Sequence, residues 1–138
     1  MKYKILILVL ITLASCESNS DSKLTLTNKS KEEIFVRITS DKKEADYLLS
    51  NNNSGAWDCM GHYLEIDSLA RFPAWYKWET FIDQFPDKKV FFYVFDADEF
   101  REYRSGNRDK NQLKYKQLEF TKEQLIKMNW EVVFRDSI

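Results

Sequence analysis

Glycine, proline, cysteine and histidine are all scarce in this chain, and each shortage excludes a class of protein. The sequence has 138 residues but only 3 glycines, 2 prolines, 2 cysteines and 1 histidine. The spacing of the glycines, at positions 55, 61 and 106, fits neither a dinucleotide-binding motif nor a P-loop. A single histidine excludes zinc sites that need two or three imidazoles. We therefore expect no metal and no cofactor, and no collagen-like or linker-rich architecture.

An excess of charge of either sign is also lacking. Lys and Arg number 21 against 22 Asp and Glu, so nothing in the charge balance favours nucleic acid as a partner. With 43% hydrophobic and 15% aromatic residues, the chain can form a packed core and is not expected to be disordered. Its length allows one domain.

The longest apolar run stands at the N-terminus. Lys2 and Lys4 precede it, and the run over residues 5–13 is too short to span a bilayer. An ordinary secretory signal or a short membrane anchor would fit this pattern. However, the next residues resemble the lipobox of bacterial lipoproteins, Leu13-Ala14-Ser15-Cys16. The resemblance implies a signal peptide over residues 1–15 and a Cys16 that carries acyl chains.

The residues after Cys16 are expected to join a membrane anchor to a folded domain. Residues 17–23 contain no apolar side chain, and we interpret 16–23 as the lipidated cysteine with a polar tether. Glu17 stands where many such lipoproteins have the Asp that retains them in the inner membrane. The resemblance therefore implies delivery to the outer membrane, with its periplasmic and surface faces both open.

Residues 24–138 are expected to form one β-rich domain. Residues 24–27 and 34–39 alternate in polarity on either side of a polar turn, which predicts a β-hairpin with one solvated face. Residues 90–95 are apolar on both faces and predict a central strand. Further strands are predicted at 62–66, 113–120 and 130–134.

Helical spacing and start signals predict two or three short helices. Apolar positions repeat with helical spacing over 74–85, a short helix or turn follows at 96–103, and a capping-box pattern opens 121–127. Trp130 is expected in the core, on the same face as Val132 and Phe134. The predicted fold is mainly β, an antiparallel β-sandwich-like domain of five to seven strands, with an α+β fold as the fallback.

A second resemblance covers about two-thirds of the chain that would remain after removal of the signal peptide. It looks like a small domain that recurs, mostly uncharacterised, in outer-membrane lipoproteins of Gram-negative bacteria. The residues that carry it are 24–30, Phe95-Asp96-Ala97-Asp98, Tyr115, Thr121, Leu125 and Asn129-Trp130. This resemblance implies no catalytic residue.

Asp96-Ala97-Asp98 is the one motif that suggests enzymatic chemistry. It resembles the first motif of haloacid-dehalogenase phosphatases, in which one Asp is the nucleophile and the other a general acid. It also resembles the Asp-x-Asp of metal-dependent glycosyltransferases. Phe100 stands where the phosphatases have Thr or Val, and the chain is too short for several βα units. We expect both carboxylates to begin a short helix, and keep a small hydrolase or transferase using them as an alternative.

Two further groups of residues are weighed as sites. Cys59 and His62 lie close in sequence, but two soft ligands do not make a metal site, and we expect Cys59 to be buried. The densest aromatic cluster spans residues 72–85, where we expect one helix face to pack on a sheet. Trp75 and Tyr76 are not explained by that packing and are candidate ligand-binding residues for a sugar.

These observations favour a non-catalytic role. We expect a membrane-anchored lipoprotein whose domain binds or interacts with a partner in the cell envelope. The partner is an unidentified protein or glycan, and the anchor is Cys16. A glycan-binding surface lipoprotein that uses Trp75 and Tyr76 is a further alternative.

Overall fold

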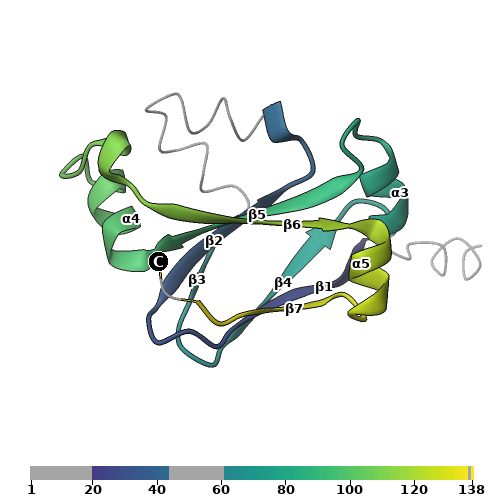
Figure 1. Ribbon diagram of the computed structural model, residues 1–138, viewed down its shortest axis with the longest axis horizontal. Helices are drawn as coiled ribbons and strands as arrows, with labels where there is room; N and C mark the ends of the chain where they lie inside the picture. The colour runs from purple at the N-terminus through teal and green to yellow at the C-terminus, as the bar shows by residue number, and fades with distance from the viewer. Residues whose placement is uncertain (1–19, 44–60, 137) are drawn as a thin grey trace, which may run out of the picture.

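The computed structural model describes residues 20–43, 61–136 and 138. Two sheets pack face to face (Figure 1). The three-stranded sheet has the order β4 (Leu69–Ala74), β1 (Asp21–Asn28), β7 (Glu131–Phe134). The four-stranded sheet has the order β3 (Gly61–Leu64), β2 (Ile34–Thr39), β5 (Lys89–Asp96), β6 (Tyr115–Thr121). Every neighbouring pair is antiparallel except β1 and β7, which are parallel. The predicted mainly-β sandwich is confirmed.

Short helices cover the two ends of the sandwich. α3 (Trp78–Asp83) and α5 (Lys122–Lys127) lie at the end where the described chain begins (Figure 1). α4 (Ala97–Arg104) lies at the opposite end, packed on the outer face of the four-stranded sheet, and is followed by the 3₁₀-helix η2 (Lys110–Gln112). We call these the tether end and the α4 end.

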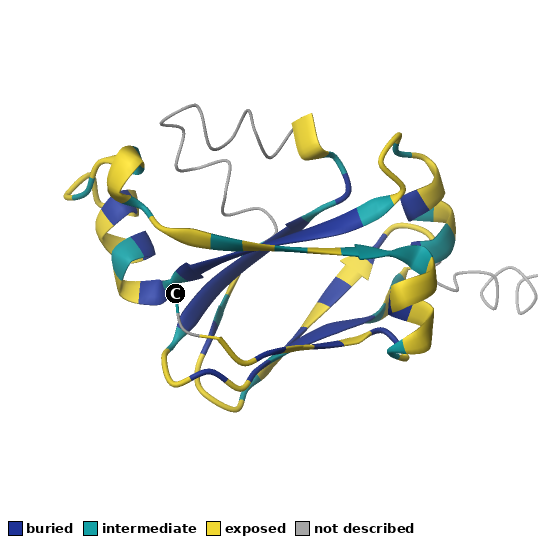
Figure 2. Ribbon diagram, in the orientation of Figure 1, coloured by how far each residue is buried: buried dark blue, intermediate teal, exposed yellow. Residues whose placement is uncertain are grey.

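The central position of β5 is confirmed. Val90, Phe92 and Val94 point into the core between the sheets, with leucine, isoleucine and tryptophan side chains from both sheets and from the helices at the tether end. The alternate residues enter a second cluster on the outer face, which is almost entirely aromatic. Because both faces are covered, β5 is buried along nearly its whole length (Figure 2).

The predicted hairpin between β1 and β2 is wrong. The two strands belong to different sheets, and β2 is buried on both faces instead of having a solvated one. The polar turn is a corner held by Asn28, which is completely buried. Its Nδ2 donates to the backbone oxygens of Glu32 (2.8 Å) and Leu64 (3.0 Å), and its Oδ1 accepts from Ser30 Oγ (2.6 Å). Alternation shows which side chains are buried but does not say which strand is the partner.

The predicted helix over 74–85 is shorter in the structure, because Ala74 ends a strand that was not predicted and residues 75–77 form the turn after it. α3 begins only at Trp78, and Ala74 is the last residue of β4. Pro73 is tolerated there because β4 is an edge strand, where a missing N–H leaves no unpaired neighbour. β1 begins at Asp21, so residues 21–23 of the predicted tether belong to a strand.

The α5 segment forms as predicted. Thr121 and Gln124 make both hydrogen bonds of the capping box. Asn129 (φ 52°) and Trp130 (φ 62°) then take left-handed conformations. The Trp130 N–H donates to the Leu125 oxygen and the Asn129 N–H to the Ile126 oxygen, which is the Schellman pattern of helix ends. Trp130 is buried with Val132 and Phe134 as predicted, but it precedes β7 instead of lying in it.

Candidate functional site

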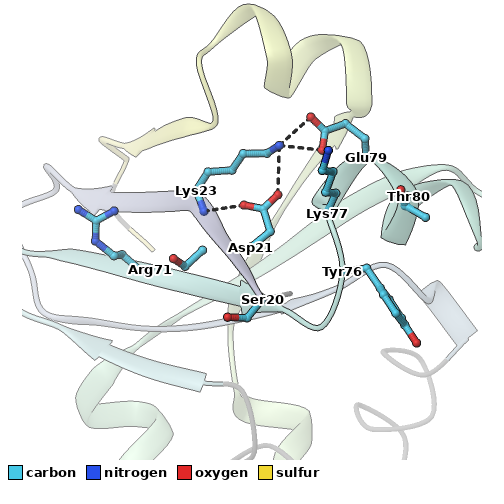
Figure 3. A pocket seen from close by; sticks show the side chains of 9 residues that line it. Ser20, Asp21, Lys23, Arg71, Tyr76, Lys77, Glu79 and Thr80 are labelled. Atoms are coloured by element: carbon cyan, nitrogen blue, oxygen red, sulfur yellow. Dashed lines mark hydrogen bonds and ion pairs between the residues drawn. The ribbon is translucent and has the colours of Figure 1, made fainter. Parts of the chain in front are cut away.

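An open depression with a volume of about 820 Å³ lies at the tether end (Figure 3). Three segments of the chain line it. Residues 20–23 contribute the start of β1, Arg71 comes from the outward face of β4, and residues 76–80 contribute the turn into α3 together with its first turn. The first described residue, Ser20, therefore belongs to the wall of the depression.

An ion network closes one side of the depression. Lys23 Nζ lies 2.6 and 2.7 Å from the two carboxylate oxygens of Glu79 and 3.1 Å from Asp21 Oδ2 (Figure 3). Burial acts to raise the pKa of both carboxyl groups, but their hydrogen bonds outweigh it and hold each pKa below its ordinary value. Burial likewise acts to lower the pKa of Lys23, but its bonds to Glu79 and Asp21 raise that pKa. All three groups are therefore charged at neutral pH.

This network has a structural role. Asp21 Oδ2 accepts from the Trp78 N–H (3.1 Å), so it caps α3 from a distant strand where Lys77 offers no capping side chain. Lys23 Nζ lies 4.3 Å from the centre of the Trp130 ring, within range of a cation–π interaction. The network thus joins β1, α3 and the end of α5, and both of its carboxylates bind the one lysine.

The remaining groups at the depression are not satisfied in this way. The side chains of Arg71 and Lys77 make no ion pair or hydrogen bond within the part of the chain that the structure describes. Trp75 is 85% exposed and Tyr76 is 56% exposed, on the turn between β4 and α3. Tyr76 points away from the ion network (Figure 3). Two cations and two large aromatic rings are therefore available to a ligand at one end of the molecule.

The rest of the aromatic cluster is explained by packing. Trp78 and Ile82 on α3 are buried, Phe72 packs from β4, and Phe81 lies half-buried against the same core. The Trp78 indole N–H donates to the Phe72 oxygen (3.0 Å), so the buried ring has its partner. The prediction that one helix face packs on a sheet is confirmed.

Asp96 and Asp98 do not form a shared site. Asp96 is the N-cap of α4, and its Oδ1 accepts from the Glu99 N–H (2.8 Å). The Asp98 side chain is 88% exposed and pairs with Arg101 (2.8 Å). The prediction that both carboxylates begin a short helix is confirmed. Within residues 20–43 and 61–136, no group of three or more His, Cys, Asp and Glu side chains is placed to hold a metal ion.

Of the pair Cys59 and His62, only His62 lies within the described residues. Cys59 lies outside the described residues, whereas His62 lies on β3. The His62 ring packs edge-on against Phe72, with centroids 5.2 Å apart, and partial burial lowers its pKa. His62 is therefore neutral at pH 7.

Only part of this site is predicted from the sequence. The aromatic pattern indicates Trp75 and Tyr76, whereas nothing in it indicates Arg71, Lys77 or the network of Asp21, Lys23 and Glu79. Asp21 and Trp78 are 57 residues apart in sequence, so no local pattern relates them. The unpaired state of the Arg71 and Lys77 side chains could not be predicted either, since Glu79 lies two residues from Lys77 in sequence but binds Lys23, and surface cations commonly lack partners.

Comparison with known proteins finds no matching family model, no similar curated protein and no similar solved structure. Among the described residues, no helix is both long and apolar enough to cross a membrane.

Proposed function

We propose that this chain is a lipid-anchored protein of the bacterial cell envelope, which presents a non-catalytic binding domain from acylated Cys16. The anchor is supported by the apolar run over residues 5–13 followed by Leu13-Ala14-Ser15-Cys16. Two or three acyl chains give stable attachment, because each buried CH₂ contributes about 0.8 kcal/mol. The outer membrane is the proposed location because Glu17 replaces the retention aspartate.

One observation supports the binding role above the others. Trp75 and Tyr76 are exposed on the turn that leads to Lys77, and Tyr76 lines the same depression as Arg71 and Lys77, whose side chains have no partner in the described structure. Large aromatic rings and unpaired arginines are the groups that binding surfaces use most. Asp96-Ala97-Asp98, the motif that suggested catalysis, begins α4, where Asp96 is the N-cap residue.

The identity of the N-terminus tests the anchor. Mass spectrometry of the mature N-terminal peptide should find Cys16 as the first residue, with acyl chains attached. Cys16→Ala should leave the chain unprocessed at the inner membrane or release it into the soluble fraction. Cys59→Ala is the matched control, because it removes the only other cysteine and should leave the membrane fraction unchanged. An unmodified Cys16 in the wild type would refute the anchor.

Carbohydrate binding is a second candidate, supported by the exposure of Trp75 and Tyr76. Aromatic faces stack on the apolar faces of sugar rings. Titration with soluble envelope oligosaccharides should then change the fluorescence of Trp75, and Trp75→Ala should abolish binding. Tyr115→Ala, at the α4 end, removes another exposed ring and should leave binding intact. Equal binding by the parent and Trp75→Ala would exclude this candidate.

A further inference from the structure

We infer that the surface formed by Arg71, Trp75, Tyr76 and Lys77 rests on the headgroup layer of the same membrane that holds the acyl chains of Cys16. This inference rests on the proposed function, because it takes Cys16 as the anchor. It adds an orientation, with the tether end against the lipid and the α4 end away from it. We call these four residues the membrane-facing surface.

The length of the tether restricts where this surface can be. Cys16 and Ser20 are separated by four peptide units. Since consecutive Cα atoms are about 3.8 Å apart, the two Cα atoms cannot be more than about 15 Å apart in any conformation. Ser20 lines the same depression as Arg71, Tyr76 and Lys77. An anchor at Cys16 therefore holds this end of the domain within reach of the headgroups.

The side chains on this surface suit a membrane interface. Tryptophan and tyrosine are enriched at the level of the headgroups, because each ring has an apolar body and a polar group that stays hydrated. Trp75 exposes 85% of its surface and Tyr76 exposes 56%. Lysine and arginine have long side chains that reach phosphate groups while their stems lie along apolar surface. The Arg71 and Lys77 side chains line the same depression as Tyr76, which follows Trp75 in the chain, and they have no competing partner in the described chain.

The acidic groups nearby do not oppose this docking. Asp21 and Glu79 both bind the single Lys23, so two carboxylates face one ammonium group and the network has a net charge of −1, which the two cations Arg71 and Lys77 at the same depression outweigh. Asp83, at the other end of α3, pairs with Lys122 (2.7 Å). Arg71 and Lys77 therefore give the depression a net positive charge, which favours a surface that carries phosphate.

The tether also explains why weak contacts are sufficient. Once Cys16 is anchored, contact between the domain and the lipid is intramolecular, and a short linker gives an effective concentration in the millimolar range. A soluble sugar would have to enter the same depression within about 15 Å of the anchored residue, in competition with the headgroups. The geometry therefore favours the lipid surface over a soluble glycan.

Fluorescence quenching by lipid tests this inference on the full mature protein. The lipidated chain with Trp57→Phe retains Trp75 and the buried Trp78 and Trp130. It is reconstituted in vesicles of equimolar phosphatidylcholine and phosphatidylglycerol, in which the acyl chains carry bromine near the headgroups. We expect strong quenching that disappears when Trp75→Phe is added. Tyr115→Trp in that last background places a ring at the α4 end, and its emission should not be quenched.

A charge test distinguishes a phosphate-dependent contact from simple proximity. Arg71→Gln with Lys77→Gln should reduce the ratio of docked to undocked domain about five-fold for each cation removed. The loss should shrink in vesicles of phosphatidylcholine alone and at high salt, where charge attraction is screened. Lys31→Gln with Lys114→Gln makes the same change in net charge at the α4 end and should leave quenching unchanged.

The outcomes separate this inference from the function on which it rests. Mass spectrometry of the reconstituted sample reports the acylation of Cys16 first. Acylated Cys16 with quenched Trp75 supports both proposals, whereas acylated Cys16 with unquenched Trp75 overturns the orientation alone. If lipid does not quench Trp75 but titration with a soluble oligosaccharide changes its fluorescence, the surface would be assigned to a glycan instead. An unacylated Cys16 would overturn both proposals.

Discussion

The two ends of the sandwich use the same kinds of side chain in opposite ways. At the α4 end, Arg101 pairs with Glu33 and Asp98, and Arg108 pairs with Glu99 and Glu102. At the tether end, Arg71 and Lys77 have no partner in the described part of the chain. The two arginines of the α4 end are therefore paired with carboxylates, whereas the side chains of Arg71 and Lys77 are available to a ligand.

The aromatic side chains differ between the ends in the same way. Phe35 and Phe100 stack at the α4 end with their ring centroids 3.8 Å apart and their planes 9° apart. Tyr63 packs against Phe35 at 4.9 Å. At the tether end, the rings of Trp75 and Tyr76 lie in solvent. The difference teaches that aromatic content alone does not identify a binding surface, because most aromatic residues here form the core.

The largest expected effect on stability distinguishes two tryptophans of the tether end, the buried Trp130 and the exposed Trp75. Trp130→Ala should lower the free energy of unfolding by about 3–5 kcal/mol, a large part of the stability of a small domain. The reason is that Trp130 is buried beside Leu125 and beneath Lys23. Trp75→Ala should change stability by less than about 0.5 kcal/mol. Urea unfolding measures both, and equal stability of the two variants would contradict the assignment of Trp130 to the core.

The next effect tests how tightly the rings at the α4 end are packed. A Cβ added at Gly61 would lie 2.1 Å from Cζ of Phe35, whose ring is held by Phe100 and Tyr63. Gly61→Ala should therefore cost about 1–3 kcal/mol of stability, the usual cost of overpacking. Phe35→Leu in the same chain shortens the opposing side chain and should recover part of the loss. A double mutant that shows no such coupling in thermal melting would mean that the ring moves aside without cost.

A smaller effect is expected from the carboxylates that suggested catalysis. Asp96→Asn with Asp98→Asn should lower stability by about 1 kcal/mol or less, since asparagine also caps helices and the lost charge only weakens the start of α4. Binding at the tether end should be unchanged. A folded double mutant that loses a phosphatase or transferase activity found in the parent would overturn the non-catalytic assignment.

The smallest expected effect is the pH dependence of the tether-end ion network. The pKa values of Asp21 and Glu79 are lowered by folding, so their stabilisation is complete above about pH 4.5, the ordinary pKa of glutamate. It is lost as the pH falls through their folded-state pKa values. The pKa of Lys23 is raised, so its contribution is lost only as the pH rises above about 10.5.

Glu79→Gln isolates this contribution. The variant should be less stable than the parent by at most about 1 kcal/mol at neutral pH, because the pair is partly exposed. The difference should diminish when urea unfolding is repeated below pH 4. Asp98→Asn alone, which breaks an exposed pair at the α4 end, is the matched control. A stability difference for Glu79→Gln that stays constant with pH would show that the network is not its cause.

The sequence by itself determined the elements whose signals lie within a few residues. The capping box of α5 joins Thr121 to Gln124, and the cap of α4 joins Asp96 to Glu99. The position of β5 follows from a run that is apolar on both faces, because a strand with two apolar faces needs cover on both. The lipobox is a short pattern of the same kind, and the role of Cys16 stays a prediction.

Only the tertiary structure decided how these elements pair and which charges remain available. Alternation over β1 and β2 was read correctly, yet Asn28 turns the chain into the other sheet through bonds to Leu64, 36 residues away. Lys23 binds Glu79, which is 56 residues away in sequence, and the Arg71 and Lys77 side chains have no partner within the described chain. Such contacts carry no local signal, because their free energy depends on where the chain brings two groups together and not on what surrounds either of them in sequence.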